Sequence, residues 1–261
     1  MSRIEAITSR DNPALQRLRK LAADPAGYRK TGTVWMEGDH LLRAARTRGW
    51  TPALVVATEA AMARPELAEL AQTAPRVLVV SAALFQGLSG LESPALMGAE
   101  YALPASAPLQ PAVDTLVLDR LQDAGNVGAI LRSAAAFGVR QVLALKGTAA
   151  LWSPKVVRAG QGAHFALQLH EGLQAADLEV LTLPLIATSS HTEHALGRVE
   201  LPRPCAWVMG HEGQGVSDAL MARCQLKLRI PQPGGEESLN VAAAAAICLY
   251  ESFRQRDLTG R

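Results

Sequence analysis

Asn126-Val-Gly-Ala-Ile-Leu-Arg132 is the stretch that decides the fold. It has the pattern of a helix start, and it comes shortly after the strand-like run Asp114-Thr-Leu-Val-Leu-Asp119. The same arrangement occurs twice more, in Val208-Met-Gly-His-Glu-Gly-Gln-Gly-Val-Ser217 and in Ile230-Pro-Gln-Pro-Gly-Gly-Glu-Glu-Ser-Leu-Asn-Val241. Each segment places glycines and one or two polar side chains between a strand and a helix. Loops of this kind carry the ligand site of an α/β sheet.

The second half of the chain alternates strand-like and helix-like segments, which predicts an α/β fold with a mostly parallel sheet. We predict strands over residues 114–119, 141–145, 165–169, 184–188, 206–209 and 226–230. We predict helices over residues 127–137, 154–160, 172–178, 215–223 and 237–255. The last helix has a wide apolar face, which suits packing across the sheet or against a partner subunit.

The first half shows a similar α/β alternation up to about residue 103. We predict helices over 14–23, 39–48 and 65–72, and short buried strands over 54–57 and 77–80. Residues 104–111 contain three prolines and no periodicity, which is typical of a semi-rigid linker. The boundary therefore separates a small α/β domain, 1–105, from a second domain, 112–261.

Composition excludes several classes of protein. The 261 residues are 49% hydrophobic and 19% charged, which is typical of globular domains. Aromatic residues make up 4%, too few for a sheet that recognises bases by stacking. The three cysteines are scattered, which indicates a reducing cytoplasm and argues against a disulfide framework or a zinc site. No apolar run approaches the roughly 20 residues that span a membrane, and basic residues interrupt the N-terminus where a signal peptide would be apolar.

Charge is distributed unevenly along the chain. Residues 1–50 carry ten Lys or Arg and five Asp or Glu, a net charge of about +5. The rest of the chain carries about −3, which gives the whole chain its net charge of +2. Such an excess suits a phosphate-binding surface, and it equally suits a solvated helix face.

The first loop, residues 122–128, combines a capping side chain with glycines. We expect Asn126 to cap the helix and Gly125 and Gly128 to let a ligand approach the backbone. Arg132 follows nearly two turns later, and we expect it to share an edge of the helix with Asn126. Arginine grips phosphate with two hydrogen bonds. Taken alone, the segment fits an ordinary capped helix with a surface arginine better.

The other two loops leave similar alternatives. Gly210-His-Glu-Gly-Gln-Gly215 predicts a tight turn, in which Glu212 bonds a ligand or Arg132, or is simply solvated. In the third loop we expect Ser238 to cap the final helix beside Asn240. Such a helix start favours a carboxylate or phosphate, although a capped helix without any ligand has the same sequence.

Taken together, the three loops resemble the three motifs of the SpoU (TrmH-like) family of SPOUT RNA methyltransferases. The first motif is carried by Asn126, Gly128 and Arg132 and the second by Gly210, Glu212, Gly213 and Gly215. The third is carried by Ile230, Pro231, Gly234, Glu237, Ser238, Leu239, Asn240 and Val241. Residues 7–13 and 36–42 are similar to that family's substrate-binding domain, which is related to RNA-binding ribosomal proteins.

The resemblance implies transfer of a methyl group from S-adenosyl-methionine to a ribose 2′-hydroxyl in structured RNA, in the cytoplasm and without a metal. It implies a deep trefoil knot in the C-terminal sheet and a homodimer through that domain, with the active site completed across the interface. The cofactor would lie in the knot against Met209, Gly210, Gly215, Ile230, Pro231 and Leu239. The residues implied in catalysis are Arg132, Asn126, Glu212, Ser238 and Asn240.

Several alternatives stay open at this point. A free arginine, with a pKa above about 12, is a poor base, so Arg132 would bind the neighbouring phosphate or stabilise the developing alkoxide. Whether His211 touches substrate is open. The RNA is ribosomal or transfer RNA, with ribosomal RNA favoured because a separate first domain adds a second grip. A catalytically inactive RNA-binding protein of the same fold is the alternative function. A dinucleotide-dependent oxidoreductase is disfavoured because no GxGxxG follows an early strand.

Overall fold

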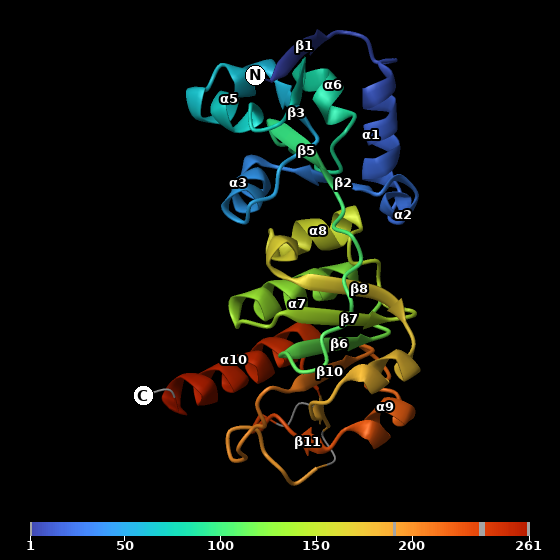
Figure 1. Cartoon of the computed structure of the whole chain (residues 1–261), viewed down its shortest axis with the longest axis vertical. Helices are drawn as coiled ribbons and strands as arrows, with labels where there is room; N and C mark the ends of the chain where they lie inside the picture. Colours follow the sequence, from blue (N-terminus) through green and yellow to red (C-terminus); the bar gives the residue numbers. More distant parts are fainter. Residues whose placement is uncertain (1, 190–191, 235–237, 260–261) are drawn as a thin grey trace. The chain divides into compact units, whose positions relative to one another are not determined.

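The computed structural model describes residues 2–189, 192–234 and 238–259, with side chains as far as residue 256. The chain forms two compact units (Figure 1). Unit 1 comprises Met1–Ala105 together with Trp152–Phe165, and unit 2 comprises Ser106–Leu151 and Ala166–Arg261. The segment 152–165 belongs by sequence to the second half of the chain, yet it packs within unit 1.

Unit 1 is built on a five-stranded mixed sheet in the order β1-β4-β3-β5-β2, with β5 antiparallel to both β3 and β2. The strands are β1 (Arg3–Ile7), β2 (Thr33–Glu37), β3 (Leu54–Thr58), β4 (Arg76–Val80) and β5 (Met97–Ala102). The helices are α1 (Pro13–Ala23), α2 (Gly27–Thr31), α3 (Asp39–Thr47), α4 (Glu59–Met62), α5 (Pro65–Ala71), α6 (Ala82–Gln86) and α8 (Pro154–Gly160). The helices and strands predicted in this half are confirmed, whereas β1, β2 and β5 were missed.

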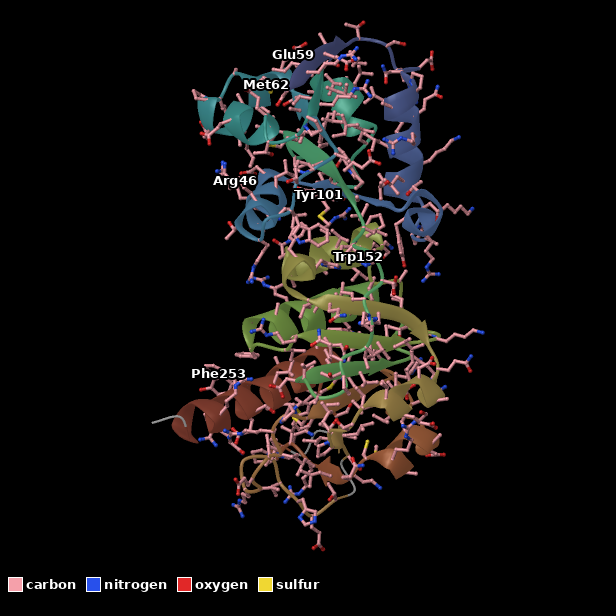
Figure 2. The ribbon with its side chains drawn as sticks, in the orientation of Figure 1. Arg46, Glu59, Met62, Tyr101, Trp152 and Phe253 are labelled. Atoms are coloured by element: carbon pink, nitrogen blue, oxygen red, sulfur yellow. The ribbon has the colours of Figure 1, made fainter. Side chains whose placement is uncertain are left out.

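An aromatic cluster joins segment 152–165 to the rest of unit 1. The ring of Trp50 lies 5.1 Å from that of Phe165 and 6.1 Å from that of Trp152, measured between centroids. Tyr101, on β5, lies 5.7 Å from Phe165, between ring centroids. Tyr101 and Trp152 of this cluster are labelled in Figure 2. Large buried rings dominate the packing energy of a small core. The crossover between two strands of unit 2 is therefore anchored by the hydrophobic core of unit 1.

Unit 2 is built on a six-stranded sheet in which every pair of neighbouring strands is parallel. The strands are β6 (Thr115–Asp119), β7 (Gln141–Leu145), β8 (Gln168–Leu173), β9 (Leu185–Thr188), β10 (Ala206–Gly210) and β11 (Leu226–Leu228). Their order is β11-β9-β10-β6-β7-β8, so the chain leaves β6 towards one edge and returns on the other side of β6. Ligands of such sheets bind beyond the carboxyl ends of the strands near this switch in direction.

Alternating side chains cover the two faces of this sheet. On one face Val117, Leu143 and Val208 pack against Leu178 and Leu220. On the other, the indole of Trp207 donates a 2.8 Å hydrogen bond to Ser252 on the last helix. The remaining α-helices are α7 (Ala124–Ala136), α9 (Asp218–Arg223) and α10 (Val241–Thr259). The described residues also form two 3-10 helices: η1 (Ala163–Ala166), whose first three residues belong to unit 1, and η2 (Ala175–Val180). Among the described residues, no helix is both long and apolar enough to cross a membrane.

In this part of the chain the sequence prediction misplaced one strand, was wrong about one helix and started two helices too early. The strand expected at 165–169 lies at 168–173, because Phe165 is drawn into the aromatic cluster of unit 1. The helix expected at 172–178 is wrong, since pairing with β7 extends β8 to Leu173 and only a 3-10 helix follows. The helices expected from 215 and 237 begin later, at Asp218 and Val241.

Candidate active site

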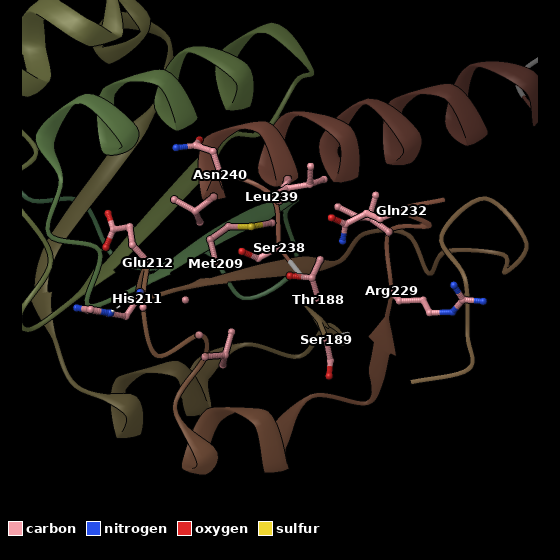
Figure 3. Close-up of a pocket in the computed structure, with 17 residues that line it drawn as sticks. Thr188, Ser189, Met209, His211, Glu212, Arg229, Gln232, Ser238, Leu239 and Asn240 are labelled. Carbon is pink, nitrogen blue, oxygen red and sulfur yellow. Dashed lines mark hydrogen bonds between the residues drawn. The ribbon is translucent and has the colours of Figure 1, made fainter. Parts of the chain in front are cut away.

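A cavity of about 470 Å³ lies at the carboxyl ends of β9, β10 and β11 (Figure 3). Of the eleven residues that the family resemblance implies in catalysis or cofactor binding, eight line it: Met209, Gly210, Glu212, Gly215, Ile230, Ser238, Leu239 and Asn240. The sequence analysis did not single out Thr188, Ser189, Arg229 and Gln232, which also line it. Thr188 and Ser189 lie at the end of a strand without a motif, whereas Arg229 directly precedes the third motif and Gln232 lies within it. Figure 3 shows His211 and Glu212 at one end of the view and Arg229 and Gln232 at the other.

A tight hairpin over residues 210–216 forms one wall of the cavity. The backbones of His211 and Gly215 exchange hydrogen bonds of 3.0 and 2.8 Å, and Gly215 has a φ of +68° that favours glycine. A Cβ on Gly210 would lie 2.1 Å from the nitrogen of Val216, which is closer than any real contact. Gly210 and Gly215 are therefore needed so that the hairpin can fold back on its own strand.

His211 faces its own loop. Its Nδ1 accepts hydrogen bonds from the backbone N–H groups of Gly213 at 3.0 Å and Gln214 at 3.3 Å. A nitrogen that accepts two N–H groups carries no proton, so this arrangement requires the tautomer protonated on Nε2. The imidazole thus stabilises the turn, and His211 also lines the cavity.

Glu212 links the hairpin to the first loop. Its carboxylate accepts the backbone N–H groups of Gln122 at 3.2 Å and Asp123 at 3.1 Å, and the side-chain amide of Asn126 at 3.3 Å. Burial alone would raise the pKa of Glu212, but the backbone and amide donors outweigh it and lower the pKa below its ordinary value. The suggested pairing of Glu212 with Arg132 is wrong within the described part of the chain, because the carboxylate is directed to the N-terminal turn of α7 instead.

The three motifs meet in a chain of side chains. Asn126 donates to Glu212, and its Oδ1 accepts a 3.0 Å hydrogen bond from the amide of Asn240. The Oδ1 of Asn240 accepts the backbone N–H groups of Ala242 and Ala243. Both amide orientations are fixed, since a carboxylate only accepts and a helix N-terminus only donates.

The two expected helix caps are therefore reassigned. Asp123 caps α7 by accepting the N–H of Asn126 at 2.7 Å, so Asn126 lies within the first turn. Asn240 caps α10, and Ser238 lies two residues before it as an exposed residue of the cavity lining. In both places an aspartate or asparagine takes the cap, in keeping with its strong preference for that position.

Arg132 lies outside the cavity. It is exposed on the third turn of α7, and among the described residues it makes no hydrogen bond or ion pair. The expectation that it shares an edge with Asn126 is wrong, because six residues of helix place two side chains about 120° apart. Pro231 is exposed and is absent from the cavity lining as described. Glu237, part of the third motif, falls outside the described residues.

The cysteines are buried and free. Burial raises the pKa of Cys205 to about 12 and that of Cys224 to about 11, and it also raises the pKa of Cys248. Thiols in this state are poor nucleophiles and poor metal ligands. Within the described ranges, no group of His, Cys, Asp or Glu side chains is arranged to hold a metal ion.

Comparison with known proteins places the chain in a family. The family described as SpoU rRNA Methylase matches residues 114–250, and a domain described as MRM3-like substrate binding domain matches residues 12–99. A protein of Synechocystis named as an uncharacterized tRNA/rRNA methyltransferase is 33% identical over 98% of this chain and 96% of its own. The 23S rRNA (guanosine(2553)-2′-O)-methyltransferase RlmP of Bacillus subtilis is 30% identical over 85% of this chain and 88% of its own.

Solved structures agree with this placement. A crystal structure of an RNA 2′-O ribose methyltransferase is 31% identical, with a TM-score of 0.82 over 97% of this chain and 99% of the other. The SpoU methyltransferase AviRb from Streptomyces viridochromogenes, crystallised in complex with the cofactor AdoMet, is 24% identical, with a TM-score of 0.84 over 94% of this chain and 98% of the other, and shares the fold. The cavity, the three loops and these matches together show that the chain belongs to the SpoU rRNA methylase family.

Proposed function

We propose that this protein transfers a methyl group from S-adenosyl-methionine to a ribose 2′-hydroxyl of ribosomal RNA. The observation that carries the proposal is the junction of Glu212, Asn126 and Asn240, one residue from each motif, at the rim of a cavity beyond the carboxyl ends of parallel strands. A family relative that matches most of this chain is named as a 23S rRNA 2′-O-methyltransferase, which supports ribosomal over transfer RNA.

The cavity fits S-adenosyl-methionine in size and chemistry. Its volume is within the usual range of roughly 300–1,000 Å³ for ligand sites. Met209, Ile230 and Leu239 offer apolar surface to an adenosine, the hairpin offers backbone, and Arg229 offers a cation that suits a carboxylate. The cofactor supplies its own electrophilic methyl group, so the protein's task is to bind and orient. We assign Met209, Gly210, Gly215, Ile230, Pro231 and Leu239 to cofactor binding.

The residues of this chain divide into those that frame the site and those that reach the RNA. Glu212, Asn126 and Asn240 hold the three loops in register, which positions the reacting groups. Ser238 is exposed in the cavity lining and can approach the ribose hydroxyl. Arg132 either binds the neighbouring phosphate or stabilises the developing alkoxide.

The position of Arg132 supports a site shared between two copies of the chain. It is exposed and does not line the cavity of its own chain, while α10 exposes Ile247, Tyr250 and Phe253 at 40%, 51% and 38%. Tyr250 and Phe253 lie against Phe137, at the end of α7. An apolar surface of this kind marks an interaction site. We infer a homodimer through unit 2, in which Arg132 of each protomer completes the other's site, and we infer the deep trefoil knot of the SPOUT fold.

The first domain, 1–105, is proposed to grip the RNA, and the second, 112–261, to carry the chemistry, with residues 104–111 as the linker. The excess of about five positive charges in residues 1–50 supports this division. Buried free cysteines and an RNA substrate suit the cytoplasm.

The decisive experiment maps 2′-O-methyl positions in ribosomal RNA from cells with and without the gene, and then restores the missing position with purified protein and S-adenosyl-methionine. An Arg132→Ala variant should bind the cofactor normally and transfer no methyl group. A protein that binds S-adenosyl-methionine and RNA but methylates neither ribosomal nor transfer RNA would instead be the catalytically inactive RNA-binding protein. Loss of cofactor binding in Arg132→Ala would make that residue structural.

A further inference from the structure

Arg120 adopts an unusual backbone conformation directly after β6. Its φ is +61°, in the left-handed region that favours glycine or asparagine. Its N–H donates to the hydroxyl of Thr148 at 3.1 Å, and that hydroxyl donates to the carbonyl of Leu118 at 3.1 Å. Strained residues of this kind persist where the surrounding structure holds them, often beside functional sites.

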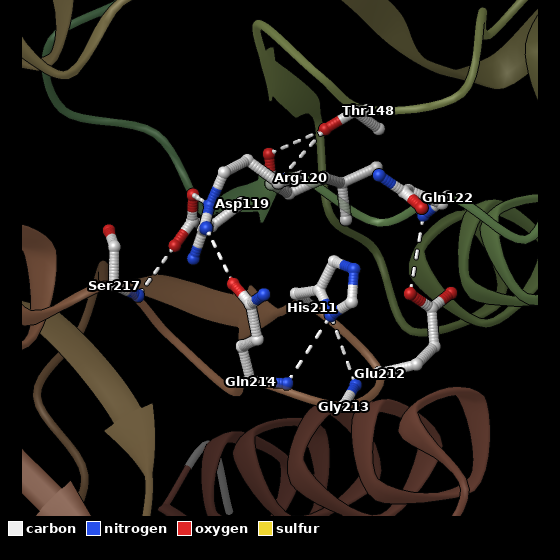
Figure 4. Close-up of polar contacts among 10 residues, drawn as sticks. Asp119, Arg120, Gln122, Thr148, His211, Glu212, Gly213, Gln214 and Ser217 are labelled. Atoms are coloured by element: carbon white, nitrogen blue, oxygen red, sulfur yellow. Dashed lines mark hydrogen bonds and ion pairs between the residues drawn. The ribbon is translucent and has the colours of Figure 1, made fainter.

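The side chain of Arg120 bridges two loops of unit 2 (Figure 4). Its Nε donates to the carboxylate of Asp119 at 3.0 Å, and its Nη1 donates to the side-chain oxygen of Gln214 at 3.0 Å. Asp119 is buried, and its second oxygen accepts the N–H of Ser217 at 2.7 Å. Arg120 thus binds the tip of the hairpin at Gln214, and Asp119 binds Ser217, where the chain leaves the hairpin.

The hairpin is held on both of its sides. Glu212 ties one side to the backbone of Gln122 and Asp123, and Gln214 ties the other to Arg120. Neither Arg120 nor Gln214 lines the cavity as described, although Gly213 and Gly215 on either side of Gln214 do. A loop with glycines at these positions has little preference of its own for one conformation. The contacts with Arg120 and with residues 122–123 therefore add to the hydrogen bonds that His211 makes within the hairpin in fixing its shape.

We propose that Arg120 is a positioning residue that latches the hairpin against the cavity through Gln214, and so sets the affinity for the cofactor. The proposal rests on the proposed function, which places S-adenosyl-methionine in this cavity. Binding is tighter when a loop is already ordered, because the cost of ordering it does not fall on the binding step. The left-handed backbone directs the guanidinium towards both partners, which explains why an arginine occupies a position that suits glycine.

The test uses the full chain and titration calorimetry with S-adenosyl-methionine. Gln214→Ala removes the side-chain oxygen but keeps the backbone of the hairpin, and should raise Kd about fivefold, as expected for one exposed hydrogen bond to a charged group. Gln214→Glu keeps an acceptor for Arg120 and should leave Kd within about twofold of the original. Gln86→Ala, at an exposed glutamine at the end of α6, is the matched control and should change nothing. Gln214→Glu and Gln86→Ala should melt at the original temperature, and Gln214→Ala about 2–4 °C lower at most, as expected for one lost hydrogen bond of about 1 kcal/mol.

A double-mutant cycle identifies Arg120 as the partner. Asparagine tolerates the left-handed backbone, so Arg120→Asn removes the guanidinium without adding strain. In that background Gln214→Ala should cause no further loss of affinity. Equal Kd values for the original protein and Gln214→Ala would overturn the latch, and so would a fivefold loss in Gln214→Glu. Should Arg120→Asn not fold, the Kd values of Gln214→Ala and Gln214→Glu still test the proposal. An original protein that binds no S-adenosyl-methionine would refute the proposed function itself.

Discussion

Asn240 has two separable roles, and substitutions can test them independently. Its Oδ1 caps α10, and its amide nitrogen donates to Asn126, which in turn donates to Glu212. Asn240→Ala removes both contacts. Asn240→Asp keeps an acceptor for the cap but places a carboxylate opposite the oxygen of Asn126, so only the link between the motifs is broken.

The expected magnitudes follow from these contacts. Asn240→Ala loses the N-cap, about 1 kcal/mol, and the hydrogen bond to Asn126, about 1–1.5 kcal/mol. It should therefore lower the melting temperature by about 4–10 °C in a chain of this size. Asn240→Asp keeps the cap, because Asp and Asn cap equally well, and loses only the hydrogen bond to Asn126, so its melting temperature should fall about half as far. Both variants lose a hydrogen bond of about 1–1.5 kcal/mol that positions the first and third motifs, so both should slow methyl transfer about tenfold.

Scanning calorimetry measures the first effect, and single-turnover methyl transfer at saturating RNA measures the second. Ser81→Ala removes the cap of α6 in unit 1 and serves as the control, with a loss of stability and an unchanged rate. An Asn240→Asp variant that transfers methyl groups at the original rate would refute the positioning role. If this variant lost as much stability as Asn240→Ala, the capping role would be assigned to the wrong atom.

Three further outcomes are expected. Gly210→Ala should weaken S-adenosyl-methionine binding at least tenfold, because its Cβ would meet the Val216 nitrogen and open the hairpin; calorimetry giving an unchanged Kd would contradict this. Because the pKa of Glu212 is lowered, its contribution to stability is complete above its ordinary value of 4.5 and is lost as the pH falls through the lower folded value. The difference in unfolding free energy between the original and Glu212→Gln should therefore be constant from pH 7 to about 5.5 and shrink only in more acidic urea series. Iodoacetamide at pH 8 should leave the three cysteines unmodified in the native protein and alkylate all three in guanidinium, as read by mass; rapid native labelling would show that the burial is wrong.

The sequence predicted most of unit 2 because its signals are local. Short apolar runs between helical segments predicted the strands, and the loops after them predicted the edge of the sheet that carries the cavity. In unit 1 the missed strand β5 contains Gly98 and Glu100, which both disfavour a buried strand. Gly98 is required because the ring of Trp35 lies 2.4 Å from where its Cβ would be. Glu100 is buried because Arg17, 83 residues away in sequence, pairs with it. Neither Trp35 nor Arg17 lies in the short stretch of sequence from which this strand would be predicted.

The candidate site shows the same limit at finer scale. The motifs predicted which loops meet, because the carboxyl ends of parallel strands lie at one edge of the sheet. The contacts between the loops depend on the directions of the side chains, which the spacing of residues does not give. Arg132 is the clearest case, because it lies about 120° around the helix from Asn126. The contact between Arg120 and Gln214 could not be predicted for a related reason. The left-handed backbone of Arg120 arises from contacts with Thr148 and Gln214, which lie in distant segments of the sequence. By contrast, the donor and acceptor roles of the Asn126 and Asn240 side chains follow once the groups at either end of this hydrogen-bonded series are known. A carboxylate at Glu212 and a helix N-terminus after Asn240 permit only one arrangement of donors and acceptors between them. Replacing the carboxylate by a donor, or the helix N-terminus by an acceptor, should therefore reverse or break these hydrogen bonds.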